Sequence, residues 1–172
     1  MYNRILVPLD GSRFSEGVLP EVLRLAAGTP ATVYLLAVAP TPEGTKAAPI
    51  TEPLVVGVLA PGGVVTRRAP PEAETKAQAL EQTTEETEQL LESRARDLRM
   101  SHLTVETAVR FGDPVEEILG YAAEHHVEVI VMATHGRTGL PETILGSVAR
   151  RVVQNGKFPV VLVRPPWLEK GH

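Results

Sequence analysis

Most of the chain alternates between short apolar runs and stretches in which apolar residues recur every three or four positions. Three of the runs lack polar alternation, which is typical of strands buried on both faces of a sheet. Another run alternates between polar and apolar residues and is expected near a sheet edge. The expected strands are Ile5–Leu9, Thr32–Val38, the alternating Leu103–Arg110, Val127–Ala133 and Phe158–Pro165.

The stretches between the runs have the periodicity of amphipathic helices. Pro20 is expected to distort the start of the first helix, because proline cannot donate a backbone hydrogen bond. Asp113 is expected to cap the third helix, with Pro114 at its first position and Glu116 completing a capping box. The expected helices are Ser15–Ala27, Glu74–Arg99, one within Gly112–His126, and Ser147–Asn155.

Strands that alternate with helices predict an α/β fold with one doubly wound, parallel, five-stranded sheet of Rossmann-like type. Ligands of such sheets sit beyond the carboxyl ends of the strands, where the strand order reverses. Two strand ends carry unusual loops, Leu9–Ser12 after the first strand and Thr134–Gly136 after the fourth. If both loops flank the reversal, they meet over one crevice.

One segment after the second strand interrupts this pattern. Residues 40–71 hold seven of the fifteen prolines and show little helical periodicity. Two apolar runs around Pro61-Gly62-Gly63 favour a hairpin there. We therefore expect one domain over residues 1–166, with an inserted loop or hairpin at 40–74, followed by a flexible tail at 167–172.

Composition excludes several classes of protein. The 172 residues include no cysteine, which rules out thiol catalysis and cysteine-based zinc sites. The net charge is −4 without a basic stripe, so we expect no nucleic-acid partner. No apolar run reaches the roughly 20 residues of a membrane helix, and the start does not read as a signal peptide. A cytoplasmic protein that does not bind membranes is expected.

The stretch after the fourth strand carries the most distinctive chemistry. Gly136 and Gly139 lie in its loop, and Gly146 with Ser147 opens the last helix. Glycine lets a backbone approach a ligand closely, and the first N–H groups of a helix are unpaired and partly positive. The group could form a phosphate site without a lysine. Glycines that only shape turns are the alternative.

Two segments of the chain resemble the universal stress protein family. They are RILVPLDGS near the start and IVMATHGRTGLPETILGSVARRVVQNGKFPVVLVRP near the end. The ATP-binding branch of that family has a motif of Gly, two residues, Gly, nine residues, then Gly-Ser or Gly-Thr. The spacing is intact in this chain, but Ala133 stands at the first glycine. Its methyl group is expected to intrude slightly on the ligand and to weaken nucleotide binding without abolishing it.

The resemblance implies an ATP site built from both segments. Asp10 would lie near the ribose and adenine, with Pro8 shaping its turn, and Val38 would line the adenine pocket. Next to them, Met132 and Ala133 would contact the nucleotide. Backbone N–H groups and the serine hydroxyl would hold the triphosphate, and these come from Gly136, Gly146, Ser147 and Val148. Arg137 and Gly139 belong to the same loop.

The resemblance also implies a partner subunit and allows an accompanying ion. Family members commonly form homodimers through the last strand, here Val160–Val163, and an apolar run on an exposed edge fits such pairing. Asp10 could help to hold Mg²⁺ on the phosphates, since that ion uses few carboxylates and several waters. No separate metal site is expected, because adjacent His125 and His126 would point about 100° apart on a helix.

Three functions are compatible with these features. The first is a dimeric, ATP-binding stress-response or regulatory protein with slow or no ATP hydrolysis. Weak catalysis is expected because Arg137 is the one evident cation of the motif and no base is clearly placed. The second is an interaction protein of the same family that binds no nucleotide, with Ala133 as the first sign of a degraded site. The third, a nucleotide-dependent enzyme, would need a second group of catalytic residues.

Overall fold

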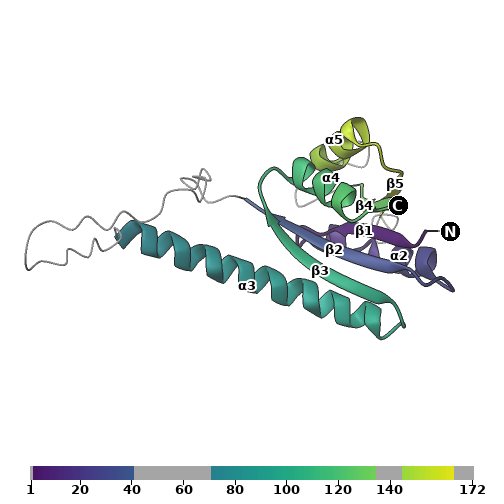
Figure 1. Ribbon diagram of the computed structural model, residues 1–172, viewed down its shortest axis with the longest axis horizontal. Helices are drawn as coiled ribbons and strands as arrows, with labels where there is room; N and C mark the ends of the chain where they lie inside the picture. Colours follow the sequence, from purple (N-terminus) through teal and green to yellow (C-terminus); the bar gives the residue numbers. More distant parts are fainter. Residues whose placement is uncertain (1, 41–70, 135–144, 165–172) are drawn as a thin grey trace, which may run out of the picture.

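The computed structural model describes residues 2–40, 71–134 and 145–164. In the helix that begins at residue 71, side chains are described from residue 81 onward. Five parallel strands form one sheet in the order β3-β2-β1-β4-β5 (Figure 1). This arrangement confirms the predicted parallel α/β fold. The strands are β1 Arg4–Pro8, β2 Thr32–Ala39, β3 Thr104–Phe111, β4 Val129–Ala133 and β5 Val160–Val163.

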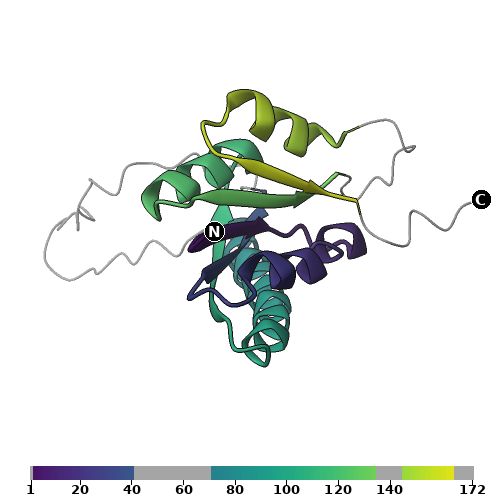
Figure 2. The ribbon, with the colours of Figure 1, turned by 90° about the vertical axis from the view of Figure 1, so that its right-hand side faces the viewer.

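Helices cover both faces of the sheet, as expected for a doubly wound fold. α4 and α5 lie on one face, and α1, α2 and α3 lie on the other (Figures 1 and 2). Each face therefore has its own apolar core. The helices are α1 Arg13–Glu16, α2 Leu19–Ala26, α3 Pro71–Arg99, α4 Pro114–Glu124 and α5 Ser147–Asn155.

Alternate residues of each strand supply the two cores, because successive side chains of a strand point to opposite faces. In β4, for example, Val129 and Val131 pack toward α2 and α3, whereas Ile130 and Met132 pack toward α4 and α5. All four side chains are buried. The central strands thus have the continuous apolar character that predicted them.

The prediction of a single helix over 15–27 is wrong, because the chain forms two. Ser12 caps α1 by accepting a hydrogen bond from the Ser15 N–H, and α1 ends after one turn. Pro20 then stands at the start of α2. Because proline has no N–H to donate to the preceding turn, the first helix cannot continue through it.

α4 begins and ends with well-defined caps. Oδ1 of Asp113 accepts the N–H groups of Val115 at 2.9 Å and Glu116 at 3.2 Å, so the predicted cap is confirmed. At the other end His126 has a φ of 51°. Its N–H donates to the Ala123 carbonyl, and the Val127 N–H donates to that of Ala122, which is the Schellman arrangement.

α3 is much longer than the sheet it packs on. It begins at Pro71, three residues before the predicted start, and has 29 residues. Leu91, Ala95 and Leu98 of its last turns are buried in the core. The described side chains from Glu81 to Gln89 are mostly exposed, and Figure 1 shows the first half of the helix standing clear of the sheet. The rest of the predicted insertion, residues 41–70, lies outside the described residues.

β3 and β5 form the two edges of the sheet. The alternating run at 103–110 was expected at an edge, and β3 confirms that position. The last strand, predicted over 158–165, is paired only over Val160–Val163, and the predicted tail lies outside the described residues. Within the described ranges, no helix combines the length and apolarity of a membrane span.

Candidate functional site

A pocket of about 240 Å³ opens at the carboxyl ends of β1, β2 and β4. The chain runs from β1 outward through β2 to β3 and then returns to form β4 on the other side of β1, so the strand order reverses there. The first turns of α4 and α5 complete the walls. The lining residues are Pro8, Leu9, Asp10, Ser15, Leu36, Val38, Pro114, Ile118, Met132, Ala133, Gly146, Ser147, Val148 and Ala149.

Eight of the eleven predicted site residues line this one pocket. They come from three separate parts of the sequence: Pro8, Asp10, Val38, Met132, Ala133, Gly146, Ser147 and Val148. The other three, Gly136, Arg137 and Gly139, lie outside the described residues. Of the two loops that were expected to flank the reversal in strand order, Leu9–Ser12 contributes Leu9 and Asp10 to this crevice. Of the other loop, Thr134–Gly136, the structure describes Thr134, which follows the lining residue Ala133.

Sequence reasoning missed part of the lining. Leu36 lies two residues before Val38 on the same face of β2, so the strand period could have identified it. Ser15 could have been noted for its spacing from Ser12. Pro114 and Ile118 gave no such signal, because their place depends on how α4 packs over the sheet.

One side of the pocket is apolar. Leu36 and Val38 of β2 face Pro114 and Ile118 of α4, and Met132 of β4 adds to the same side. The Leu36 and Ile118 side chains are almost completely buried. Among the residues that the structure describes, this side has no charged group, so it suits a flat, mostly apolar ring.

The other side of the pocket is the beginning of α5. Gly146 is the N-cap and has no side chain to accept the first N–H groups. Its own N–H donates to the Thr134 carbonyl at 2.8 Å, which joins the start of α5 to the residue that follows β4. Ser147 is the first helical residue and is therefore not the N-cap of α5. The start of α5 thus presents partial positive charge and an exposed hydroxyl at the pocket.

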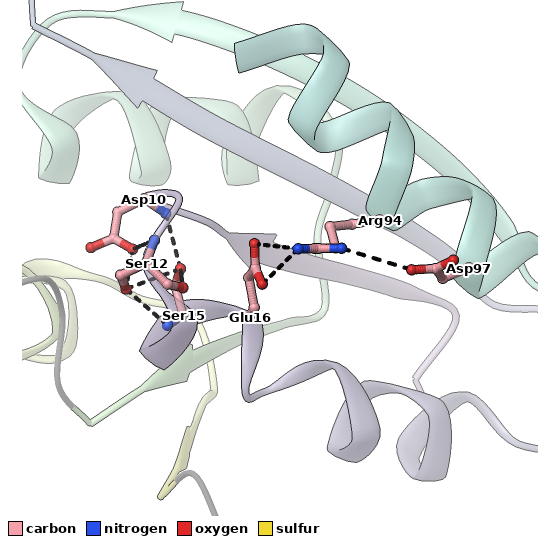
Figure 3. A network of polar contacts seen from close by, with 6 residues as sticks. All are labelled: Asp10, Ser12, Ser15, Glu16, Arg94 and Asp97. Atoms are coloured by element: carbon pink, nitrogen blue, oxygen red, sulfur yellow. Dashed lines mark hydrogen bonds and ion pairs between the residues drawn. The ribbon is translucent and has the colours of Figure 1, made fainter. Parts of the chain in front are cut away.

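Asp10 is the one charged residue among the described lining residues, and its loop is held by serines (Figure 3). Oδ1 of Asp10 accepts hydrogen bonds from the Ser12 hydroxyl at 2.6 Å and the Ser12 N–H at 3.0 Å. The Ser15 hydroxyl accepts the Asp10 N–H at 3.2 Å and donates to the Ser12 carbonyl at 3.0 Å. Ser15 is buried. The loop therefore fixes both the backbone and the carboxylate of Asp10.

The side chain of Ala133 points away from the apolar slot. It belongs to the core cluster on the α2 and α3 face, together with Leu9 and Val131, whereas Met132 belongs to the opposite cluster. Ala133 lines the pocket at the end of β4, but its methyl group packs in the core. This geometry argues against the intrusion that the sequence led us to expect.

An ion pair joins the two helices beside the pocket. The Arg151 guanidinium of α5 lies 3.1 Å from the Asp113 carboxylate at the start of α4. The hydrogen bond from Arg151, together with those from the backbone N–H groups, lowers the pKa of Asp113 from its ordinary value. Because Pro114 follows Asp113 and lines the pocket, the pair helps to fix the spacing of these walls.

The two histidines directly after α4 lie apart from the residues that line the pocket. The His125 ring stacks on Tyr121, with 4.0 Å between ring centroids, and also contacts Tyr34. His126 is exposed at the end of the helix. Among the residues described, no group of three histidine, aspartate or glutamate side chains is placed to hold a metal ion.

Comparisons with known proteins agree with the fold and with the family resemblance. A family model for the universal stress protein family matches residues 1–59 and 62–164. The universal stress protein YxiE of Bacillus subtilis is 31% identical over 164 residues, which cover 95% of this chain and 100% of that protein.

Two solved structures extend the comparison. The structure of hypothetical protein MJ0577, a universal stress protein of Methanocaldococcus jannaschii, has a TM-score of 0.74 at 27% identity and covers 95% of this chain and 96% of its own. A universal stress protein from Archaeoglobus fulgidus, solved in complex with dAMP, has a TM-score of 0.54 at 21% identity. It covers 95% of this chain and 98% of its own, and at that identity the likeness shows the fold.

Proposed function

The chain belongs to the universal stress protein family, and from this we propose that its pocket binds an adenine nucleotide, with ATP as the expected ligand. The protein acts as a homodimeric regulatory protein of the stress response, and it hydrolyses ATP slowly or not at all. One observation carries the proposal: the end of β1 and its loop, the end of β2, the end of β4 and the start of α5 supply eight of the predicted site residues to a single pocket.

Each part of the nucleotide has a matching part of the pocket. The adenine occupies the slot between Val38 and the first turn of α4. Asp10 lies toward the ribose, and the phosphates extend to the N–H groups of Ser147 and Val148 at the start of α5. Gly136, Arg137 and Gly139 are proposed to complete the phosphate side, and any Mg²⁺ is held by the phosphates together with Asp10.

One further fact supports an adenine nucleotide as the ligand, and another supports binding without efficient hydrolysis. The relative from Archaeoglobus fulgidus was solved with dAMP, which is also an adenine nucleotide. In the part of the chain that the structure describes, no cation lines the pocket and Asp10 is its one carboxylate. Efficient phosphoryl transfer needs both a cation on the transferred phosphate and a group that orients the attacking water. We therefore expect the protein to bind ATP and to hydrolyse it slowly.

The homodimer is proposed to form along β5. Among the described residues this strand pairs with β4 alone, and its run of apolar residues, Val160–Val163, lies at the edge of the sheet. Leu162 is 39% exposed there. Pairing with a second copy would cover this edge and remove the aggregation risk of an open strand.

Mass spectrometry of the native purified protein and calorimetric titration with ATP and Mg²⁺ test the proposal. We expect bound adenine nucleotide, or binding below millimolar ATP, and little ADP formed over hours. Changing Gly146 to Val together with Ser147 to Leu should abolish binding, whereas Gln154→Ala, at the exposed far end of the same helix, should not.

Other outcomes would select another function. Absence of binding at millimolar ATP in the folded protein would favour the interaction protein that uses no nucleotide. Rapid release of ADP with turnover would favour an enzyme. Unchanged binding in the Gly146 and Ser147 variant would place the site elsewhere.

A further inference from the structure

The loop that carries Asp10 contacts the pocket on one side and α3 on the other. Both Nη2 hydrogen bonds of Arg94 in α3 go to Glu16 of α1, at 3.0 Å to Oε1 and 2.9 Å to Oε2. The two side chains are only 31% and 22% exposed. Figure 3 shows Glu16 reaching toward α3, with Asp10, Ser12 and Ser15 gathered beside it. This pair joins segments that are 78 residues apart in sequence.

A second contact joins the same two segments. Gly11 has a φ of +74°, and a Cβ atom built on it would lie 3.3 Å from Cδ2 of Leu90. Leu90 and Arg94 are one turn apart, so both lie on the same face of α3. That face therefore lies against the β1–α1 loop, with Leu90 beside Gly11 and Arg94 paired with Glu16.

The ion pair is connected to Asp10 by a short path. Glu16 follows Ser15, whose buried hydroxyl accepts the Asp10 N–H and donates to the Ser12 carbonyl. Ser12 in turn donates two hydrogen bonds to the Asp10 carboxylate. A shift of α1 relative to α3 would therefore move the groups that hold Asp10.

Breaking the ion pair between Arg94 and Glu16 is expected to cost stability. Nε of Arg94 is buried and has no hydrogen-bond partner among the described residues. If Glu16 is removed, this partly buried guanidinium loses its main compensation, and removing one member of such a pair costs more than removing both. The contact is expected to hold α1 in one place.

We propose that Leu90 and Arg94 of α3 are positioning residues for Asp10. Nucleotide binding in the pocket is thereby coupled to the packing of α3 against the β1–α1 loop. The coupling rests on the proposed function. It is reciprocal, since any contact on α3 that favours one position of the loop changes nucleotide affinity, and nucleotide changes the stability of α3 equally.

Calorimetric titration of variants with ATP tests the path to Asp10. Arg94→Gln should weaken ATP binding roughly 3- to 10-fold, the range expected for residues that couple sites without touching the ligand. Arg96→Gln removes the same charge from an exposed position two residues away and should leave the affinity unchanged. In an Asp10→Asn background, Arg94→Gln should have no further effect.

The Asp10→Asn background separates positioning from general weakening. A variant that merely loosened the fold would reduce the affinity equally in both backgrounds, and that result would overturn the proposal. Equal affinities of the Arg94→Gln and wild-type proteins would overturn it as well. Glu16→Gln with Arg94→Gln should cost no more than the larger single change, because the two residues act as a unit.

Hydrogen exchange tests the same contact without nucleotide, so its result remains interpretable if the wild-type protein binds no ATP. Amide exchange in the peptide covering Gly11 to Glu16 should be faster in Arg94→Gln than in the wild type or in Arg96→Gln. Unchanged exchange would contradict the positioning role, whereas lack of ATP binding by the wild type would contradict only the nucleotide site. If ATP binds, it should slow exchange over residues 86–99.

Discussion

At the scale of single residues, position on a strand decides what a substitution does. The sequence aligned Ala133 with a glycine of the nucleotide motif, and this alone made its methyl group look harmful. The structure places that methyl group in the core on the α2 and α3 face. Strand alternation assigns the methyl group to a face of the sheet only once the neighbours on each face are known.

Replacing Ala133 with glycine tests this reading. We expect ATP affinity to change by less than about twofold, because the methyl group does not face the slot. Stability should fall by about 0.5–1 kcal/mol, because the change removes a methyl group that is buried in the core and adds conformational freedom to the unfolded chain. Calorimetry and urea unfolding give the two values. A tenfold gain in affinity would show that the methyl group does intrude on the ligand.

Gly11 and Gly28 form a matched pair for the contact between the Asp10 loop and α3. Both have a positive φ, +74° and +70°, but only Gly11 has a neighbour within 4 Å of the added Cβ, at Leu90. Changing either to alanine should cost about 1–2 kcal/mol from the left-handed backbone. Gly11→Ala should cost more in urea unfolding, and equal losses would mean that Leu90 moves aside freely.

At the scale of elements, the sequence predicted the strands and most helix positions well. Strand runs such as 127–133 are strongly apolar, and Asp113 and Pro114 mark the start of α4 clearly. The break between α1 and α2 was underestimated, because the effect of Pro20 depends on whether tertiary contacts reward a new helix start at Leu19. The placement of Pro114 and Ile118 in the pocket also needed packing information that local periodicity does not contain.

The end of α4 offers a test of local backbone cost. His126 adopts the left-handed conformation at the position where Schellman motifs favour glycine. His126→Gly should therefore stabilise the protein by about 0.5–1 kcal/mol, with His126→Ala as the control that removes the ring but keeps the strain. Urea unfolding measures both. Stabilisation by alanine as large as that by glycine would mean that the ring, not the backbone, is unfavourable.

At the scale of the whole molecule, the sheet has two edges with different surroundings. α3 packs beside β3, while β5 ends the sheet with an apolar, partly exposed strand. The parallel order β3-β2-β1-β4-β5 therefore positions the pocket at the centre and the proposed subunit contact at one side. The sequence predicted the crevice from its alternating strands and helices, and it predicted the subunit contact from the family resemblance. The described fold is what brings the pocket residues together.

A charge placed on β5 tests the proposed homodimer. Leu162→Asp should convert dimer to monomer in light scattering coupled to size-exclusion chromatography, because it would bury an unpaired carboxylate in the interface. Met100→Asp is the matched control, since Met100 is 70% exposed and lies far from β5, just after α3. A wild-type monomer, or a dimer that survives Leu162→Asp, would contradict this contact.

The central claim is that the pocket at the carboxyl ends of β1, β2 and β4 holds an adenine nucleotide. Titration of isotope-labelled protein with ATP and Mg²⁺, followed by amide NMR shifts, tests it most directly. We predict the largest shifts at Gly146, Ser147 and Val148, with further shifts at Asp10 and Val38. Amide signals that do not move at millimolar ATP, or that move only away from these residues, would contradict the account.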